Sequence, residues 1–243
     1  MLDRIRQARL VWPTLVTAAA LAVLIGLGTW QLQRKAWKDG LQREMDQRAG
    51  QAPRSVSIGP ELAKLAPYTR VRVRGRFRHD GERYVYAPHP RLGSGVLVFT
   101  PLTLMDDSTL MVNRGFVPDA LRDPARRADG QLAGEAEVVG LVREPEAQAA
   151  FVPANDPARN FWYWRDIAAM AGNSPKVLPV YLDAVAEPAN PGGWPKGGGT
   201  LLQLPNKHLE YTVTWYGIAL TLVGVYFAFA RGRLQAAGGK PQA

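Results

Sequence analysis

Two long runs without a charged side chain lie near the ends of the chain, and about 180 residues of more polar character separate them. The first run covers residues 11–30 and the second residues 211–230. About 20 residues in a helix reach roughly 30 Å, which is the thickness of the hydrocarbon layer of a bilayer. Aromatic side chains typical of a membrane interface stand near the ends of both runs: Trp12, Trp30, Tyr211 and Trp215. The pattern therefore predicts two transmembrane helices, at residues 11–31 and 211–230.

A cleaved signal peptide is the alternative for the first run. Such a peptide has an apolar core of about 7–15 residues, followed by a cleavage site of small residues. The run here is longer, and it continues into the sequence WQLQR at residues 30–34, which matches no such site. We therefore expect an uncleaved membrane anchor.

The charges divide unequally between the two tails and the segment between the spans. The chain has 30 Lys+Arg and 21 Asp+Glu, for a formal charge of +9. Residues 1–11 carry +2 and residues 231–243 carry +3, which leaves +4 on the segment between the spans. Short basic tails stay in the cytoplasm, whereas long loops cross the membrane largely regardless of charge. We therefore expect cytoplasmic tails at residues 1–10 and 231–243 and an extracytoplasmic domain at residues 32–210.

Basic residues directly after the first span argue locally for the opposite orientation, and nearby acids offset them in part. The bases are Arg34, Lys35, Lys38, Arg43 and Arg48, and the acids are Asp39, Glu44 and Asp46.

The overall excess of basic over acidic residues in the chain would by itself suggest a nucleic-acid partner. Because the two tails carry more than half of that excess, we expect membrane lipid, and no nucleic acid, among the partners.

The segment between the spans changes from a helical to a strand pattern. The helical period continues past the membrane through residues 32–50. Residues 69–77 then alternate strictly, and we expect a hairpin in which a turn at 79–82 returns the chain along 84–87. Further strands are expected at 96–104, 110–116, 136–142 and 177–183, a short helix at 164–171, and a turn-rich or flexible connector at 190–199. The expected fold is a membrane α+β protein whose two transmembrane helices flank a β-rich domain, either an antiparallel sheet or an open barrel.

Few side chains suit catalysis. Cysteine is absent, which excludes disulfides, thiolate nucleophiles and cysteine metal sites. No Gly-x-Ser-x-Gly or His-Glu-x-x-His motif occurs, and the chain has 3 histidines. We therefore expect no enzymatic activity.

A row of arginines is the densest charge feature of the chain. Arg70, Arg72, Arg74, Arg76 and Arg78 alternate along one predicted strand, so they share a face at a spacing of roughly 6.6 Å. Such a row repels itself unless anions lie nearby. Carboxylates on a neighbouring strand, lipid headgroups, a partner protein and nucleic acid are the alternatives for those anions, and the topology disfavours nucleic acid.

The outer ends of the two spans carry the candidate binding site. Its residues are His208, Tyr211 and Trp215 on one face of the second helix, and Trp30, Arg34 and Lys38 where the first helix leaves the membrane. An imidazole at the headgroup level, with aromatic rings below it and cations across from it, suits a haem. His208 would be the axial metal ligand, and the bases would face the propionates. A solvated histidine, with the tryptophans serving only as interface anchors, is the alternative.

Several stretches of the sequence carry a family resemblance. They are LGTWQL at 27–32 with Arg34 and Trp37-Lys38, RVRVRGRF at 70–77, VNRGFVP at 112–118, GLVR at 140–143, FVP at 151–153 followed by Asn160, Trp162 and Arg165-Asp166, and HL at 208–209 with Tyr211 and TWYG at 214–217. In these stretches the chain resembles the surfeit locus protein one family, the assembly factors of haem-copper cytochrome c oxidase.

The resemblance implies a role in building the haem a centre of oxidase subunit I. It implies haem a as the cofactor, oxidase subunit I and a haem a synthase as partners, and His208 as the haem contact. The role of the facing bases is an inference from this sequence alone. Since the first span begins at residue 11, with no targeting segment ahead of it, we expect a bacterial inner membrane with the main domain in the periplasm.

Two functions from different classes fit these features. In the first, a haem-handling chaperone holds haem a through His208 and presents it to subunit I. In the second, a scaffold without a cofactor docks an assembly intermediate through its sheet and arginine row. Gly217, Gly224 and Ala228 have the spacing of helix contacts in lipid and would then supply packing.

Overall fold

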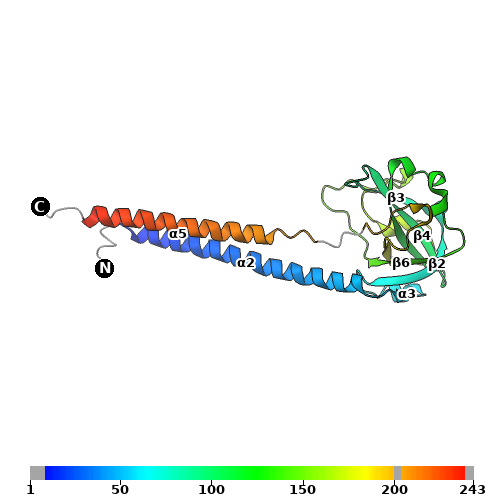
Figure 1. The fold of residues 1–243 in the computed structure, drawn as a ribbon, viewed down its shortest axis with the longest axis horizontal. Helices are drawn as coiled ribbons and strands as arrows, with labels where there is room; N and C mark the ends of the chain where they lie inside the picture. Colours follow the sequence, from blue (N-terminus) through cyan, green and yellow to red (C-terminus); the bar gives the residue numbers. More distant parts are fainter. Residues whose placement is uncertain (1–8, 200–203, 239–243) are drawn as a thin grey trace. The chain divides into compact units, whose positions relative to one another are not determined.

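The computed structural model describes residues 9–199 and 204–238 of the 243-residue chain. Its contacts divide the chain into two compact units, one of Met1–Arg43 with Gln203–Ala243 and one of Glu44–Leu202. The first unit contains a pair of long helices and the second a β-rich domain (Figure 1). Of the charges counted in the two tails, Asp3, Arg4, Arg6 and Lys240 lie outside the described residues.

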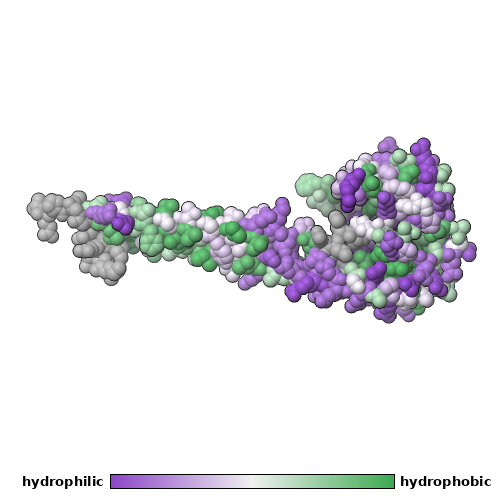
Figure 2. Space-filling model, in the orientation of Figure 1, coloured by the Kyte–Doolittle hydropathy of each residue, from purple (hydrophilic) through white to green (hydrophobic). Residues whose placement is uncertain are grey.

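The two long helices are α2 and α5. Helix α2 covers Val11–Gly50 and helix α5 covers His208–Gly238. Each is long and apolar enough to cross a membrane, and hydrophobic side chains cover much of the surface of the pair (Figure 2), as expected where lipid is the solvent. At 1.5 Å per residue, α2 is roughly 60 Å long, about twice the thickness of the hydrocarbon layer. The polar C-terminal part of α2 therefore continues past the membrane.

The helices run antiparallel and pack through small and hydroxyl-bearing residues. Gly28 lies directly against Tyr216, since a Cβ added at Gly28 would come within 2.6 Å of the Tyr216 ring. The hydroxyl oxygens of Tyr216 and Thr29 are 3.2 Å apart. Toward the other end of the pair, the hydroxyl oxygens of Thr14 and Tyr226 are 2.5 Å apart.

The glycines of α5 do not mediate the packing of α5 against α2. A Cβ added at Gly217 or Gly224 would meet no atom within 4 Å in the described part of the chain, and Ala228 is exposed. The close approach uses a glycine on α2 instead, because the ring of Tyr216 needs room against the opposite backbone.

The β-rich domain contains seven strands in its described residues. They are β1 (Arg54–Ser55), β2 (Arg70–Phe77), β3 (Arg83–Tyr86), β4 (Gly95–Leu104), β5 (Thr109–Pro118), β6 (Glu135–Arg143) and β7 (Val177–Ala184). The sheet order is β1-β2-β6-β7-β5-β4-β3, and β2 also pairs with β4 through residues 75–77 against 102–104. This additional pairing closes β2, β6, β7, β5 and β4 into a barrel, with β1 and β3 at its margins.

The predicted β-rich domain is confirmed, and each predicted strand matches an observed one to within two residues, whereas β1 was not predicted. The predicted hairpin is wrong: β3 pairs with β4, because β6 and β4 already occupy the two edges of β2. The sheet is also closed, not open, and it contains the parallel pairs β1–β2 and β5–β7 beside its antiparallel ones. The chain between β5 and β7 includes β6, which gives the length that a parallel connection needs.

Short helices complete the domain. They are α3 (Gly59–Leu62), α4 (Ile167–Ala171), and the 3-10 turns η1 (His79–Gly81), η2 (Asp119–Leu121), η3 (Pro124–Gly130), η4 (Pro157–Arg159) and η5 (Pro191–Gly193). Helix α4 begins later than predicted, because the Asp166 side chain accepts a hydrogen bond from Ala169 N and so caps the helix at residue 166.

Alternation along β2 separates its arginines from its apolar residues. Val71, Val73 and Phe77 are buried, whereas the arginines between them lie at the surface. The buried residues join Leu102 and Leu182 in the barrel core. Full burial of such a side chain contributes roughly 1.5–3 kcal/mol, so the alternation fixes which face of β2 is inside.

Residues 190–199 are turn-rich, and they belong to the sheet margin. Lys196 and Phe116 exchange two backbone hydrogen bonds of 2.9 Å. Gly115 precedes Phe116 with φ 120°, and a Cβ added to it would lie 1.9 Å from the carbonyl oxygen of Lys196. Only glycine fits this close approach, which ties the segment to β5.

Candidate functional site

His208 begins helix α5, where the apolar part of that helix starts. The side-chain oxygen of Asn206 accepts a hydrogen bond of 3.4 Å from the backbone N–H of His208. Thr212, which is buried, donates through its hydroxyl to the carbonyl oxygen of His208 at 2.9 Å. The backbone around His208 is therefore held on both sides.

The imidazole of His208 contacts helix α2. Its Nδ1 lies 2.7 Å from Oε1 of Gln31. A carbonyl oxygen only accepts hydrogen bonds, so Nδ1 carries the proton and its N–H donates a hydrogen bond to Oε1 of Gln31. In the neutral ring this tautomer places the free electron pair on Nε2. A metal-ligating histidine commonly has this arrangement, in which a hydrogen bond at one nitrogen orients the ring and the other nitrogen binds the metal.

The residues just before His208 are bound to the polar part of α2 by three hydrogen bonds, which we call the clasp. In the clasp, Lys38 Nζ donates to the carbonyl oxygen of Pro205 at 2.7 Å, Asn206 Nδ2 donates to Asp39 Oδ1 at 2.9 Å, and the N–H of Leu204 donates to Gln42 Oε1 at 2.8 Å. Lys35 also forms an ion pair of 2.6 Å with Asp39. Because Asn206 contacts both Asp39 and the backbone of His208, the clasp fixes the start of α5 against α2.

The other predicted site residues lie on the same two helices, but their side chains are exposed, half-buried or in contact with their own helix. Trp30 and Tyr211 are 52% and 53% exposed on their helices. The Arg34 guanidinium lies 4.4 Å from the ring centroid of Trp37, on its own helix. Trp215 is half-buried, and its Nε1 is buried without a hydrogen-bond partner among the described residues. Within residues 9–199 and 204–238, the polar contacts of the predicted set that join the two chain segments are those of His208 with Gln31 and of Lys38 with Pro205.

The donor set fits a haem. The porphyrin supplies four ligands to the iron, so the protein needs to supply only one or two axial ligands. His208 presents an oriented imidazole whose Nε2 is free for that purpose, exposed aromatic rings lie on both helices, and Lys38 retains donors beyond the one that binds Pro205. No group of three or more metal-binding side chains occurs among the described residues.

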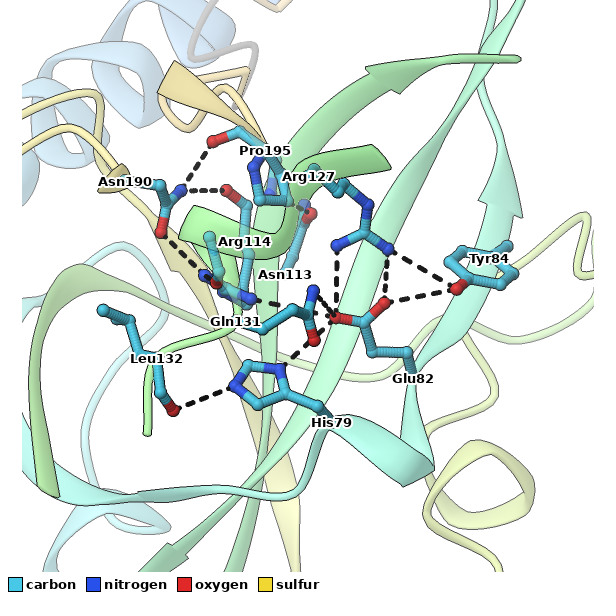
Figure 3. Close-up of polar contacts among 12 residues, drawn as sticks. His79, Glu82, Tyr84, Asn113, Arg114, Arg127, Gln131, Leu132, Asn190 and Pro195 are labelled. Carbon is cyan, nitrogen blue, oxygen red and sulfur yellow. Dashed lines mark hydrogen bonds and ion pairs between the residues drawn. The ribbon is translucent and has the colours of Figure 1, made fainter. Parts of the chain in front are cut away.

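A second polar cluster lies inside the β-rich domain and is centred on Glu82 (Figure 3). Glu82 is 4% exposed. Arg127 donates to both of its carboxylate oxygens, Gln131 donates to Oε1 at 3.2 Å, and the Tyr84 hydroxyl donates to Oε2 at 3.2 Å. His79 Nδ1 is 3.5 Å from Oε1. Burial alone would raise the pKa of Glu82, but hydrogen bonds from His79 and Arg127 and the charge of Arg127 lower that pKa to about 2.

One carboxylate on the neighbouring strand β6 lies against the arginine row. Arg72 and Arg74 both pair with Glu137 of β6, at 3.2 and 3.0 Å. Arg78 instead donates to the hydroxyl of Ser174. The carboxylate alternative is therefore confirmed for two arginines, which share a single acid.

Sequence reasoning missed Gln31, Asp39 and Asn206 as members of the interface cluster. These residues have ordinary polar side chains, and no spacing rule links positions that lie 167 to 177 residues apart. The antiparallel register of the two helices would have placed them near His208, but the hydrophobic pattern alone does not set that register.

These features define a membrane protein with two spans and a β-barrel domain, in which a histidine and a polar clasp join the helices where their apolar segments end. The SURF1 family matches residues 18–220, and the chain belongs to this family.

Individual relatives resemble the chain over most of its length. A SURF1-like protein from Monosiga brevicollis is 41% identical over 86% of this chain and 85% of its own length. The proteins named Surfeit locus protein 1 from Homo sapiens and Rattus norvegicus are 39% and 38% identical, each over 85% of this chain and over 74% and 72% of their own lengths.

Proposed function

We propose that the protein is an assembly factor that binds haem a between its two helices and passes it to subunit I of a haem-copper cytochrome c oxidase. Haem a is then cargo, received from a haem a synthase. The observation that carries the proposal is the hydrogen bond between His208 Nδ1 and Gln31 Oε1, which leaves the electron pair of Nε2 for the iron. The link to the oxidase is what the family resemblance of the sequence implies, and the chain belongs to that family.

Different side chains would contact different parts of the haem, which is planar and carries two carboxylates. His208 would bind the iron and Gln31 would hold the imidazole plane. Lys38 and Arg34 would face the propionates, since both lie on the polar part of α2 just beyond the apolar segment. Trp30, Tyr211 and Trp215 would supply apolar surface to the ring. His208 would hold the cargo at a membrane interface, from which it must leave again.

The proposal includes an orientation in the membrane. The β-rich domain lies in the periplasm of a bacterium, and the ends of the chain lie in the cytoplasm. Support comes from Arg231 and Arg233 at the C-terminal end of α5, because short basic segments stay on the cytoplasmic side. An alkaline phosphatase fusion at Asp119 is expected to be active, and an inactive fusion would contradict this orientation.

The assembly role is tested in a bacterial strain that lacks its own copy of the protein. The wild-type chain should restore the haem a content of oxidase subunit I, and His208→Ala should restore at most about a tenth of it. His89→Ala is the matched control, since His89 lies in the β-rich domain, where its Nδ1 accepts from Arg91 N and Leu92 N and its ring packs against Phe116. Full restoration by His208→Ala would contradict the haem role of this residue.

A scaffold that docks an oxidase intermediate is the second candidate. One observation favours it: Arg72 and Arg74 share the single carboxylate of Glu137, and Arg76 is exposed, so the outer face of β2 keeps excess positive charge. An acidic surface on a partner would complement that face. Combined substitution of Arg72, Arg74 and Arg76 by Gln should then abolish oxidase maturation while the haem content of the purified factor stays unchanged. Arg159→Gln, at an 86% exposed side chain, is the control.

A further inference from the structure

Arg114 of β5 is a buried cation with unused hydrogen-bond donors. Its side chain is 1% exposed. Its Nη2 donates to the carbonyl oxygen of Gly130 and, at 3.0 Å, to Oδ1 of Asn190. Its Nε and Nη1 have no hydrogen-bond partner among the described residues. Figure 3 shows Arg114 beside Gln131, with its dashed contacts reaching Asn190 and Glu82.

Glu82 does not accept a hydrogen bond from Arg114. Its nearer oxygen is 3.8 Å from Arg114 Nη1, which is an ion-pair distance but too long for a hydrogen bond. Both Glu82 oxygens already accept from Arg127, and Gln131 and Tyr84 donate to them as well. One ionised carboxylate thus faces two buried guanidinium groups.

Glu82, Arg127 and Arg114 together therefore carry a net charge of +1 in the interior. Burial lowers the pKa of Arg114 to about 10, which still leaves the group charged at neutral pH. A buried charge is stable only when it is paired and its donors are satisfied. Water could accept from the free donors, but it would not offset the charge.

A small cavity adjoins this arginine. It has a volume of about 40 Å³, and Arg114, Asn190, Phe77, Leu132 and Pro188 are among its lining residues. A volume of this size holds one or a few particles of the size of water. Glu137 also lines the cavity, but its carboxylate already forms ion pairs with Arg72 and Arg74 at the surface. Arg114 is thus the cation in the lining whose donors are unused.

We propose that this cavity binds a monovalent anion of halide size against Nε and Nη1 of Arg114. The anion would neutralise the buried excess charge and accept the two unused hydrogen bonds. Chloride is the probe of choice, because it is a monovalent anion whose size matches the small volume of the cavity. This site lies in the β-rich domain and is independent of the proposed haem role.

The test uses the full chain in detergent. The midpoint of thermal unfolding is measured in potassium chloride and in potassium gluconate at the same ionic strength. The midpoint should rise in chloride by roughly 5 °C and then saturate, as for a ligand that binds only the folded state. Arg114→Met should remove the difference between the two salts. Arg76→Met, which removes an exposed arginine of β2, should keep it.

A second measurement applies even if Arg114→Met does not fold. The line width of chloride-35 in NMR should increase with the wild-type protein, and bromide should reverse this broadening by competition. Equal unfolding midpoints in chloride and gluconate, or broadening that bromide leaves unchanged, would show that water alone fills the cavity and would overturn the proposal.

Discussion

Nδ1 of His208 lies 2.7 Å from Oε1 of Gln31, although 177 residues separate the two in the sequence. The contact joins the start of α5 to the level of α2 where the apolar run gives way to polar residues. It defines the tautomer of the imidazole and leaves Nε2 free. The proposed haem role rests on this relationship more than on any other contact.

Substitution of Gln31 should alter the haem site without removing the ligand. In Gln31→Leu the Nδ1–H loses its acceptor, and haem affinity should fall about 10–100-fold, the usual effect of losing such an orienting partner. In Gln31→Glu the carboxylate accepts the hydrogen bond from Nδ1 more strongly, so the imidazole gives more electron density to the iron. The midpoint potential of the bound haem should therefore become more negative. Haem titration and redox potentiometry measure the two effects. Gln33→Leu, at an exposed position two residues away, should change neither, and equal values for all three variants would contradict the positioning role of Gln31.

Gly28 sets the distance between the two helices. In Gly28→Ala the new Cβ would lie 2.6 Å from the Tyr216 ring, so the helices must separate or the ring must move. The expected loss of stability is about 1–3 kcal/mol, as for other overpacked contacts. Unfolding in detergent measures it. Gly26→Ala is the matched control, because its Cβ would meet nothing within 4 Å. The packing account fails if both variants are equally stable.

Glu82 should make the β-rich domain sensitive to acid. Its pKa is about 2 in the folded protein and 4.5 in the reference state, so the folded state favours the ionised carboxylate. The resulting stability is present above pH 4.5 and is lost as the pH falls toward 2, with a total of roughly 3 kcal/mol. Unfolding free energy measured against pH should show this decline.

Glu82→Gln removes the same contribution at neutral pH. The variant leaves Arg127 and Arg114 without a buried anion and should lose about 3–5 kcal/mol at pH 7. Its stability should also vary less between pH 4.5 and 2 than that of the wild type. The exposed Glu144→Gln should stay within about 0.5 kcal/mol of the wild type. A Glu82→Gln profile parallel to that of the wild type would refute the assignment.

Gly115 should tolerate no side chain. In Gly115→Ala the Cβ would lie 1.9 Å from the carbonyl oxygen of Lys196, so the backbone pairing of Lys196 with Phe116 must break. We expect a loss above about 2 kcal/mol, from strain and from the two hydrogen bonds. Gly134→Ala shares the positive φ but has open space around its Cβ, so it should lose only about 1 kcal/mol. Equal losses in thermal unfolding would show that backbone strain alone matters at Gly115.

The sequence predicts the elements of the fold better than their pairing. The alternation of residues 69–77 identified β2, because one face of that strand is buried and the other is not. The partner of β3 could not be found in this way, since a turn after β2 looks the same whether or not the next strand pairs back. Closure of the barrel depends on residues 75–77 pairing with 102–104, a tertiary contact with no local signal.

The candidate site was predictable only in part. His208, Trp30, Arg34, Lys38, Tyr211 and Trp215 follow from helical spacing and charge at the ends of the spans. Gln31 and Asn206 do not, because their roles arise from the register between the helices. The Glu82 cluster was missed because an isolated Glu between strands resembles any surface acid until its burial is known.

The most direct test is the absorption spectrum of the purified protein after coexpression with a haem a synthase. The wild-type chain and His89→Ala should copurify with haem a, and His208→Ala should carry at least tenfold less. If His208→Ala retained the haem content and spectrum of the wild type, His208 would not be the ligand, and the central claim would be contradicted.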